Sequence, residues 1–331
     1  MTSVSSPDLL DLCTRALIAC GFTEENAGAL ARQTVLTEEL GQPIVGVSHM
    51  FDYVDGIAGG RIDGKAGPTI TTPAPTMIHV DGNGGLPQTG FDRAFDQFIE
   101  TAGELGVCIF MNMNTTLCGS LGTFAYRVAE AGMVCFAATN GSPLVAGSGG
   151  TKAVYGTSPM AFSAPQSGDG PLLIDQSSSA TAYVNIRAAA ERGETIPTGW
   201  AIDKEGNDTA DPNAAMEGTM LAFGGARGAN IALMMEVLAA GLTGGHWSLD
   251  AGSFIAGDRV PGTGLFVMAI DPSRATSGFQ ERLGDQLRRL SGEFNVHIPG
   301  TAKAAMRAKA VSEGLEIDDA MMERLRSLVG D

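Results

Sequence analysis

Residues 139–244 hold five short motifs in a fixed order: TNGSP (139–143), GTSPMAF (156–162), IDQSSSA (174–180), IPTGWAID (196–203) and FGGARG (223–228). The second and third contain short apolar runs of the kind that form β-strands, and the fifth leads into a strongly apolar helical segment, 231–242. Because strands and helices share this region without regular alternation, the sequence predicts a mixed α/β fold and not a doubly wound parallel sheet.

Helical patterns dominate both ends of the chain. Ser6 and Pro7 predict the cap and first position of a helix that stops at Gly21, and Thr23 predicts the cap of a second helix that continues to residue 40. Further helices are expected at 46–59, 91–105, 122–131, 226–242 and 278–290, with a helical tail over 301–328. Strands are expected at 69–80, 107–111, 134–138, 160–163, 172–174 and 264–270.

Composition and charge exclude several classes of protein. The 331 residues carry a net charge of −16, which argues against nucleic-acid or membrane partners but leaves room for a small anionic substrate held by a few local cations. No apolar segment reaches about 18 residues and no signal peptide is evident, so a cytoplasmic protein is expected. The five cysteines are odd in number and lack a CxxC spacing, which indicates reduced, mostly buried thiols and no metal site.

Two common nucleotide-binding signatures are missing from the sequence. The glycines at 147–150 lack the GxGxxG spacing, and no Gly-Lys-Ser/Thr triplet is present. A bound dinucleotide would therefore need other elements.

Among the four histidines, His49 is the strongest candidate for proton transfer. It precedes Asp52 by three residues, a spacing that places both side chains on one helical face. A carboxylate there could orient the imidazole and stabilise its protonated form. An ordinary surface ion pair explains the spacing equally well.

Two segments are candidates for binding phosphate or ribose. Asp175 ends an apolar run and precedes small polar residues, which could be a ligand site or an ordinary polar turn. Arg227 lies among glycines at the start of a predicted helix, where backbone N–H groups and a guanidinium favour anions. The alternative for Arg227 is a solvated side chain in a glycine-rich loop.

The ordered motifs, together with VDGNGGL (80–86) and Ile298-Pro299-Gly300, resemble the malate/L-lactate dehydrogenase family of NAD(P)-dependent oxidoreductases. The resemblance implies a non-Rossmann cofactor domain with a largely antiparallel sheet, residues 116–292, inserted in a helical substrate and dimerisation domain, residues 1–115 plus 293–331. It implies a homodimer or higher oligomer. It also implies hydride transfer between NAD or NADP and a 2-hydroxy/2-oxo acid, with cyclic imino acids (ketimines) as the alternative substrates.

The resemblance also carries over site residues by position. Thr157 falls near the substrate. The positions that should meet the cofactor are Leu117, Cys118, Gly119, Ser120, Leu121, Asp175, Gln176, Ser177, Arg227, His297, Thr301 and Lys303.

The chain departs from the family at its usual catalytic positions. Ile44 and Val45 stand where the family has Ser-His, and His49 stands where it has a substrate-binding Arg. Leu117 replaces a second histidine, and Asn185 replaces a frequent acidic residue. We therefore expect His49, oriented by Asp52, to donate the proton or to hold the substrate carboxylate. The alternatives are a cofactor-binding sensor without redox activity and a non-redox lyase or isomerase.

Overall fold

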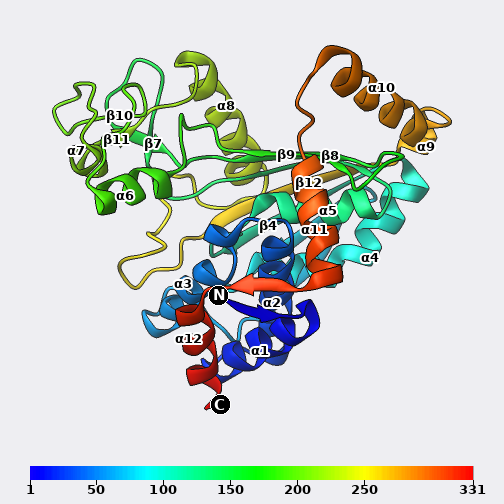
Figure 1. Ribbon diagram of the computed structural model, residues 1–331, viewed down its shortest axis with the longest axis horizontal. Helices are drawn as coiled ribbons and strands as arrows, with labels where there is room; N and C mark the ends of the chain where they lie inside the picture. The colour runs from blue at the N-terminus through cyan, green and yellow to red at the C-terminus, as the bar shows by residue number, and fades with distance from the viewer. Residues whose placement is uncertain (331) are drawn as a thin grey trace.

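A seven-stranded sheet forms the centre of the computed structural model, which describes residues 1–330 (Figure 1). Its strand order is β2–β3–β4–β12–β5–β8–β9. In this order β3 and β4 pair in parallel, and the other five pairings are antiparallel. The strands are β2 (Thr69–Ala74), β3 (Met77–Asp81), β4 (Val107–Thr115), β5 (Val134–Thr139), β8 (Met160–Ala164), β9 (Leu172–Gln176) and β12 (Thr263–Ile270).

Helices cover both faces of this sheet. On one face α4 (Pro87–Leu105) and α5 (Leu121–Glu130) enclose an aromatic core, in which the ring of Phe91 contacts Phe110 and Phe124 edge to face at 5.2 and 5.0 Å. On the other face α8 (Ala226–Glu236) continues into the π-helical η2 (Val237–Leu242) and packs Met235 with Phe266 of β12. Burial on two sides explains why the central strands are apolar throughout.

The two ends of the chain form one helical layer below the sheet (Figure 1). It contains α1 (Ser6–Ala19), α2 (Glu24–Glu39), η1 (Pro43–Val45), α3 (Val47–Ala58) and α12 (Asp319–Val329). Strand β1 (Thr2–Val4) pairs antiparallel with β13 (Leu315–Ile317), which joins the two termini. Helix α11 (Thr301–Glu313) packs against α2, and Leu9, Leu30, Met50 and Leu325 are buried in the shared core.

A smaller lobe projects from the sheet beside α8 (Figure 1). Its four strands have the order β10–β11–β6–β7, and its core contains Val145, Ile186 and Met220. The elements are β6 (Val145–Ala146), β7 (Ala153–Tyr155), α6 (Tyr183–Arg192), β10 (Ala201–Ile202), α7 (Pro212–Glu217) and β11 (Thr219–Met220). Helices α9 (Pro272–Ala275) and α10 (Phe279–Phe294) follow β12.

The mixed α/β prediction is confirmed, and three local predictions are wrong. The expected strand at 69–80 is a hairpin, because Pro75 makes a turn between β2 and β3 and cannot donate to a strand ladder. The expected helical tail is interrupted by β13, where Gly314 adopts φ 88° and ends α11. Ser5, not Ser6, caps α1, since its hydroxyl accepts the N–H of Asp8 at 3.2 Å. The Thr23 cap of α2 is confirmed.

Within residues 1–330, no helix is long and apolar enough to cross a membrane. In the same part of the chain, no group of three or more His, Cys, Asp or Glu side chains is arranged to hold a metal ion.

Candidate functional site

His49 and Asp52 form the pair that their helical spacing predicts. Both lie on α3, and His49 Nδ1 is 2.7 Å from Asp52 Oδ2. The His49 side chain is 19% exposed, so most of it is packed and part of it remains accessible. The rings of Tyr53 and Phe254 lie 5.2 and 5.3 Å from the imidazole centroid. This packing fixes the ring and leaves Nε2 as the nitrogen that Asp52 does not engage.

The helix that carries this pair begins after Gly46, against the Glu38 side chain. A Cβ at Gly46 would lie 2.1 Å from Glu38 Oε1. The same Glu38 oxygen accepts the Val47 N–H at 2.7 Å, which caps the first turn of α3. Burial raises the pKa of the Glu38 carboxyl, against the opposing effect of that N–H.

Tyr53 connects the His49 helix to residues 117–121. Its hydroxyl donates to the carbonyl of Leu117 at 2.9 Å, and a Cβ at Gly119 would lie 3.2 Å from the same hydroxyl. Leu117 packs against the apolar core that contains Tyr53 and Phe254, so the residue that replaces a family histidine serves packing here. Cys118 and Leu121 are buried, and burial raises the pKa of the Cys118 thiol to about 12. The segment can therefore offer a ligand backbone groups, and not a reactive thiol.

Asp175 lies at the N-terminus of α5. Its Oδ2 accepts the Gly122 N–H at 3.1 Å. The side chain of Gln42 hydrogen-bonds to the same carboxylate, and Gln42 Oε1 accepts the Ser120 hydroxyl at 3.2 Å. Burial raises the pKa of the Asp175 carboxyl. The Lys303 ammonium, the Gly122 N–H and the Gln42 side chain oppose this shift. The Asp175 carboxylate is therefore a partly buried hydrogen-bond acceptor at the N-terminus of α5, with the Lys303 ammonium as its nearby cation.

Gly300 holds the start of α11 against β9 and thereby brings Lys303 toward Asp175. Its φ of 93° favours glycine, and a Cβ would lie 2.7 Å from the Leu173 nitrogen. His297 and Thr301, on either side of Gly300, are exposed. Among residues 1–330 neither side chain has a hydrogen-bond partner.

Thr157 lies beside the end of β9. Its carbonyl accepts the backbone N–H of Ser178 at 2.9 Å and the Ser178 hydroxyl at 2.8 Å. Gln176 is exposed and Ser177 is partly buried next to it. The Asp175 segment and the Thr157 loop therefore form one continuous surface.

Arg227 lies apart from these groups, in the smaller lobe at the N-terminus of α8. It is exposed, and over the described residues it makes no ion pair or hydrogen bond. Beside it is a cavity of about 410 Å³ whose lining includes the glycines at 147, 149, 150, 199, 224 and 225. Gly224 and Gly225 adopt φ of 58° and 64°, and no atom lies within 4 Å of a Cβ built on either. Their backbone is open to a ligand at the helix N-terminus, where anions are favoured.

The sequence missed Tyr53, Phe254 and Gln42. Tyr53 follows His49 by four residues, so helical spacing would have found it. Phe254 and Gln42 reach the site through the tertiary fold and carry no local signal. His79 has a structural role, as expected, since its Nε2 lies 2.7 Å from the Thr243 carbonyl. The five cysteines are free, and all except Cys20 are buried, as predicted.

Asn185, at the position where the family often has an acidic residue, lies on α6 in the smaller lobe. Its side-chain amide donates to the Thr181 hydroxyl at 3.0 Å. The residue is exposed.

Comparison with known proteins places the chain in a family. The malate/L-lactate dehydrogenase family model matches residues 4–326. The chain is 32% identical over 331 residues to a Delta(1)-pyrroline-2-carboxylate/Delta(1)-piperideine-2-carboxylate reductase of Pseudomonas syringae pv. tomato, covering 99% of this chain and 96% of the relative. It is 34% identical over 317 residues to a (2R)-3-sulfolactate dehydrogenase (NADP(+)) of Chromohalobacter salexigens, covering 96% and 95%.

A solved structure shows the same architecture over the whole chain. The crystal structure of delta1-piperideine-2-carboxylate reductase from Pseudomonas syringae superposes with a TM-score of 0.94 at 31% identity, covering 99% of this chain and 100% of that one. The resemblance inferred from the motifs is thus confirmed: the chain belongs to the malate/L-lactate dehydrogenase family.

Proposed function

We propose that this chain is an NAD- or NADP-dependent oxidoreductase that transfers hydride between the nicotinamide and carbon 2 of a small 2-hydroxy/2-oxo or cyclic 2-imino acid. The observation that carries the proposal is the placement of His49. It is oriented by Asp52, packed by Tyr53, and joined through Tyr53 to the segment that begins at Leu117. The relatives support this reading, because their names include an NADP(+)-dependent dehydrogenase and a reductase of cyclic imino acids.

His49 would supply the proton or hold the substrate carboxylate. The protonated imidazole can do either through its Nε2–H, and a positioned general acid contributes roughly 10²- to 10⁴-fold to rate. Asp52 would keep the proton on Nδ1 and leave Nε2 facing the substrate. Thr157, at the far side of the Asp175 surface, would contact the substrate.

The cofactor would be held by groups that the fold leaves with free hydrogen-bonding capacity. Asp175 fits a ribose hydroxyl, because it is a partly buried carboxylate with acceptor capacity beyond the Gly122 N–H. Arg227 and Lys303 fit phosphate charges, and the open glycine backbone at 224–225 fits a close approach of phosphate. The bound nicotinamide supplies the hydride. The backbone of 117–121, with Gln176, Ser177, His297 and Thr301, would complete the contacts.

Between the two substrate classes, one observation favours cyclic imino acids. Val45 and Leu117 are aliphatic where the family has histidines, which leaves His49 as the imidazole of this site. A cyclic imine carries a basic nitrogen that can arrive protonated, so hydride addition needs no further proton from the enzyme. A 2-oxo acid needs a donor to its developing alkoxide.

We also propose the domain division and the oligomer that the resemblance implies. The helical core of α1–α3 and α12 supports a unit of residues 1–115 plus 293–331, and the antiparallel strands β5, β8, β9 and β12 support a non-Rossmann cofactor domain of residues 116–292. A homodimer or higher oligomer is supported by an apolar outer face of α8 and η2, where Leu233, Met234 and Val237 are about half exposed.

The test is a substrate panel with purified protein. We expect NADPH or NADH to raise the melting temperature and to be oxidised by a five- or six-membered cyclic 2-imino acid faster than by pyruvate, oxaloacetate or sulfopyruvate. Cofactor binding without oxidation across the panel would support the sensor alternative. Products formed from hydroxy acids without added cofactor would support the lyase alternative.

A further inference from the structure

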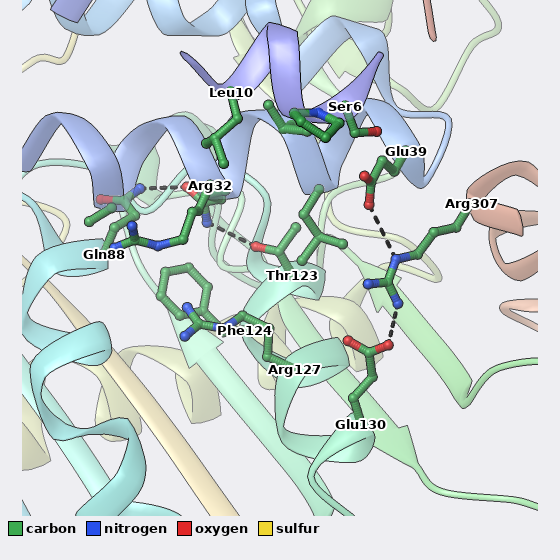
Figure 2. Close-up of a pocket in the computed structure, with 15 residues that line it drawn as sticks. Ser6, Leu10, Arg32, Glu39, Gln88, Thr123, Phe124, Arg127, Glu130 and Arg307 are labelled. Atoms are coloured by element: carbon green, nitrogen blue, oxygen red, sulfur yellow. Dashed lines mark hydrogen bonds and ion pairs between the residues drawn. The ribbon is translucent and has the colours of Figure 1, made fainter. Parts of the chain in front are cut away.

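A second cavity, of about 400 Å³, lies between α1, α2, α4, α5 and α11 (Figure 2). None of the residues proposed above to bind cofactor or substrate lines it. Its volume is within the range that accommodates small organic ligands. Nothing in the proposed reaction uses this space.

One end of the cavity carries an excess of positive charge. Arg32 and Arg127 share a single carboxylate, since Arg32 Nε and Arg127 Nη1 contact the two oxygens of Asp92 at 3.1 and 2.5 Å. Two guanidiniums and one carboxylate leave a formal charge of +1. Over residues 1–330, Arg32 Nη1 and the Nε and Nη2 of Arg127 have no hydrogen-bond partner, so donors remain for a second carboxylate.

The opposite end carries an excess of negative charge. Arg307 lies between Glu39 and Glu130, and it contacts both carboxylates (Figure 2). Its Nε is 3.2 Å from Glu39 Oε2, and Glu39 is only 11% exposed on its side chain. Two carboxylates and one guanidinium leave a formal charge of −1. A ligand ammonium would balance it.

The space between the two ends is mainly apolar, with the Gln33 amide and Thr123 Oγ1 as polar groups on its wall. Pro7, Leu10, Leu36 and Phe124 line it. The two ends are separated by the seven residues of α2 from Arg32 to Glu39, which is a rise of about 10 Å. Ser6 Oγ, at the edge of this space, is buried and has no hydrogen-bond partner.

We propose that this cavity binds an elongated zwitterion, an aliphatic ω-amino carboxylate. The carboxylate pairs with Arg32 and Arg127, the chain packs against the apolar wall, and the ammonium pairs with Glu39 and Glu130. A simple anion or cation matches only one end, and a short α-amino acid cannot reach both.

Occupancy of the cavity also affects the segment at 117–121, a consequence that rests on the proposed function. Gln33 lines the cavity, and its Nε2 donates to the Ser120 carbonyl at 3.2 Å and to Thr123 Oγ1 at 2.9 Å. Gln88 lines the cavity too, and its Nε2 donates to the Cys118 carbonyl at 3.0 Å. A ligand that restrains these amides restrains the backbone that we assign to the cofactor, and so changes NADPH affinity.

Calorimetric titration of the full chain, without cofactor, tests the binding site. The probes are 6-aminohexanoate, hexanoate and hexylamine, which share length and differ in charge, and β-alanine, which has both charges but a short chain. We expect 6-aminohexanoate to bind at least about tenfold more tightly than the other three, the difference of one charge-assisted contact. Equal affinity for hexanoate or hexylamine, or no heat with 6-aminohexanoate, overturns the proposal.

Two variants test which end of the cavity binds the carboxylate of the ligand and which end binds its ammonium. Arg32→Gln should weaken the binding of 6-aminohexanoate about tenfold and leave the binding of hexylamine unaffected. Glu130→Gln should weaken the binding of 6-aminohexanoate by a similar factor and leave the binding of hexanoate unaffected. Both residues are at least 40% exposed on their side chains, so the variants should fold. The exposed pair Arg187→Gln and Glu191→Gln on α6 provides matched controls that should change nothing. Loss of binding in the controls as well, or retention in both cavity variants, contradicts the assignment.

NADPH titration with and without saturating 6-aminohexanoate then tests the coupling. A changed NADPH affinity in the wild type, absent in Arg32→Gln, supports it. An unchanged affinity overturns the coupling. Failure to bind NADPH at all contradicts the proposed function. This outcome can be distinguished from failure of the zwitterion site, because the zwitterion is titrated without cofactor.

Discussion

The His49 imidazole is hydrogen-bonded to an acidic side chain and packed against two aromatic rings. The Asp52 carboxylate fixes one ring nitrogen, and the aromatic rings of Tyr53 and Phe254 fix the plane. A side chain held this way loses little entropy when a substrate arrives. The proposed chemistry would therefore depend on this one imidazole.

Replacing His49 should separate chemistry from cofactor binding. We expect His49→Gln to lower kcat/KM at least about 10²-fold, because the group that would hold the carboxylate of an imino acid, or donate the proton to a 2-oxo acid, is lost, while the Kd for NADPH changes little. Asp52→Asn should cause a smaller loss of the same kind. His246→Gln, at an exposed histidine, is the control and should keep wild-type kinetics. A His49→Gln enzyme with unchanged kcat/KM would remove the residue from the mechanism.

Asp175 should make stability depend on pH in a predictable direction. Burial raises its pKa in the folded protein, so between the ordinary aspartate pKa and the raised value the folded state holds a proton that the unfolded state has lost. The stability from this group is therefore full below the ordinary pKa and declines as pH rises through that window.

Asp175→Asn removes this titration. The free energy of unfolding of the variant, relative to wild type, should rise with pH across the window and be least favourable at acid pH. Urea unfolding of both proteins from about pH 4 to pH 8 measures this difference. A relative stability that instead falls with rising pH would mean that the folded protein lowers the Asp175 pKa.

At the scale of elements, the site is made where three helix N-termini meet loops rich in glycine. The starts of α3, α5 and α11 are set by Gly46, Gly122 and Gly300, and at each a Cβ would lie within 2.7 Å of a neighbouring atom. At Gly300 the neighbouring atom is backbone, whereas at Gly46 and Gly122 it is the carboxylate of Glu38 or Asp175, so each helix start is packed against the groups around the candidate site. The helices themselves were predictable from hydrophobic spacing, but these close approaches were not, because they depend on segments distant in sequence.

Gly300→Ala tests the contact between α11 and β9. We expect a loss of at least about 2 kcal/mol in the free energy of unfolding, since the residue has φ 93° and the added Cβ meets the Leu173 backbone. Cofactor affinity should fall as well, because Lys303 moves. Gly292→Ala in α10, where no atom lies within 4 Å of the added Cβ, should gain up to about 1 kcal/mol. Equal effects at both positions would contradict this account of Gly300.

At the scale of the whole molecule, the sequence was most informative about the fold and least informative about the site. The apolar runs at β4, β5 and β12 predicted the sheet, because central strands buried on both faces carry a continuous signal. The two-residue strands of the smaller lobe were missed, since such short segments show no periodicity. The partners of Asp175 are Lys303 of α11, Gly122 of α5 and Gln42 just before η1, which only the tertiary fold brings together.

The proposed oligomer is also a property of the whole molecule. Leu233 and Met234 of α8 and Val237 of η2 are exposed apolar side chains within one helical turn, and Trp247 covers Gly241 beside them. We expect Met234→Glu to shift the mass measured by light scattering from an oligomer to a monomer, because it places a charge in an apolar interface. Val311→Glu, at an exposed site on α11, is the control and should keep the wild-type mass. Wild-type protein that is monomeric would contradict the proposed oligomer.

The most direct test of the central claim follows a labelled hydride. Protein is incubated with NADPH or NADH deuterated at nicotinamide C4 and a cyclic 2-imino acid, and the product is analysed by NMR. The account predicts deuterium at carbon 2 of the amino acid with the wild type, and strongly reduced transfer with His49→Gln despite retained cofactor binding. Product without deuterium, or wild-type transfer by the His49→Gln variant, would contradict it.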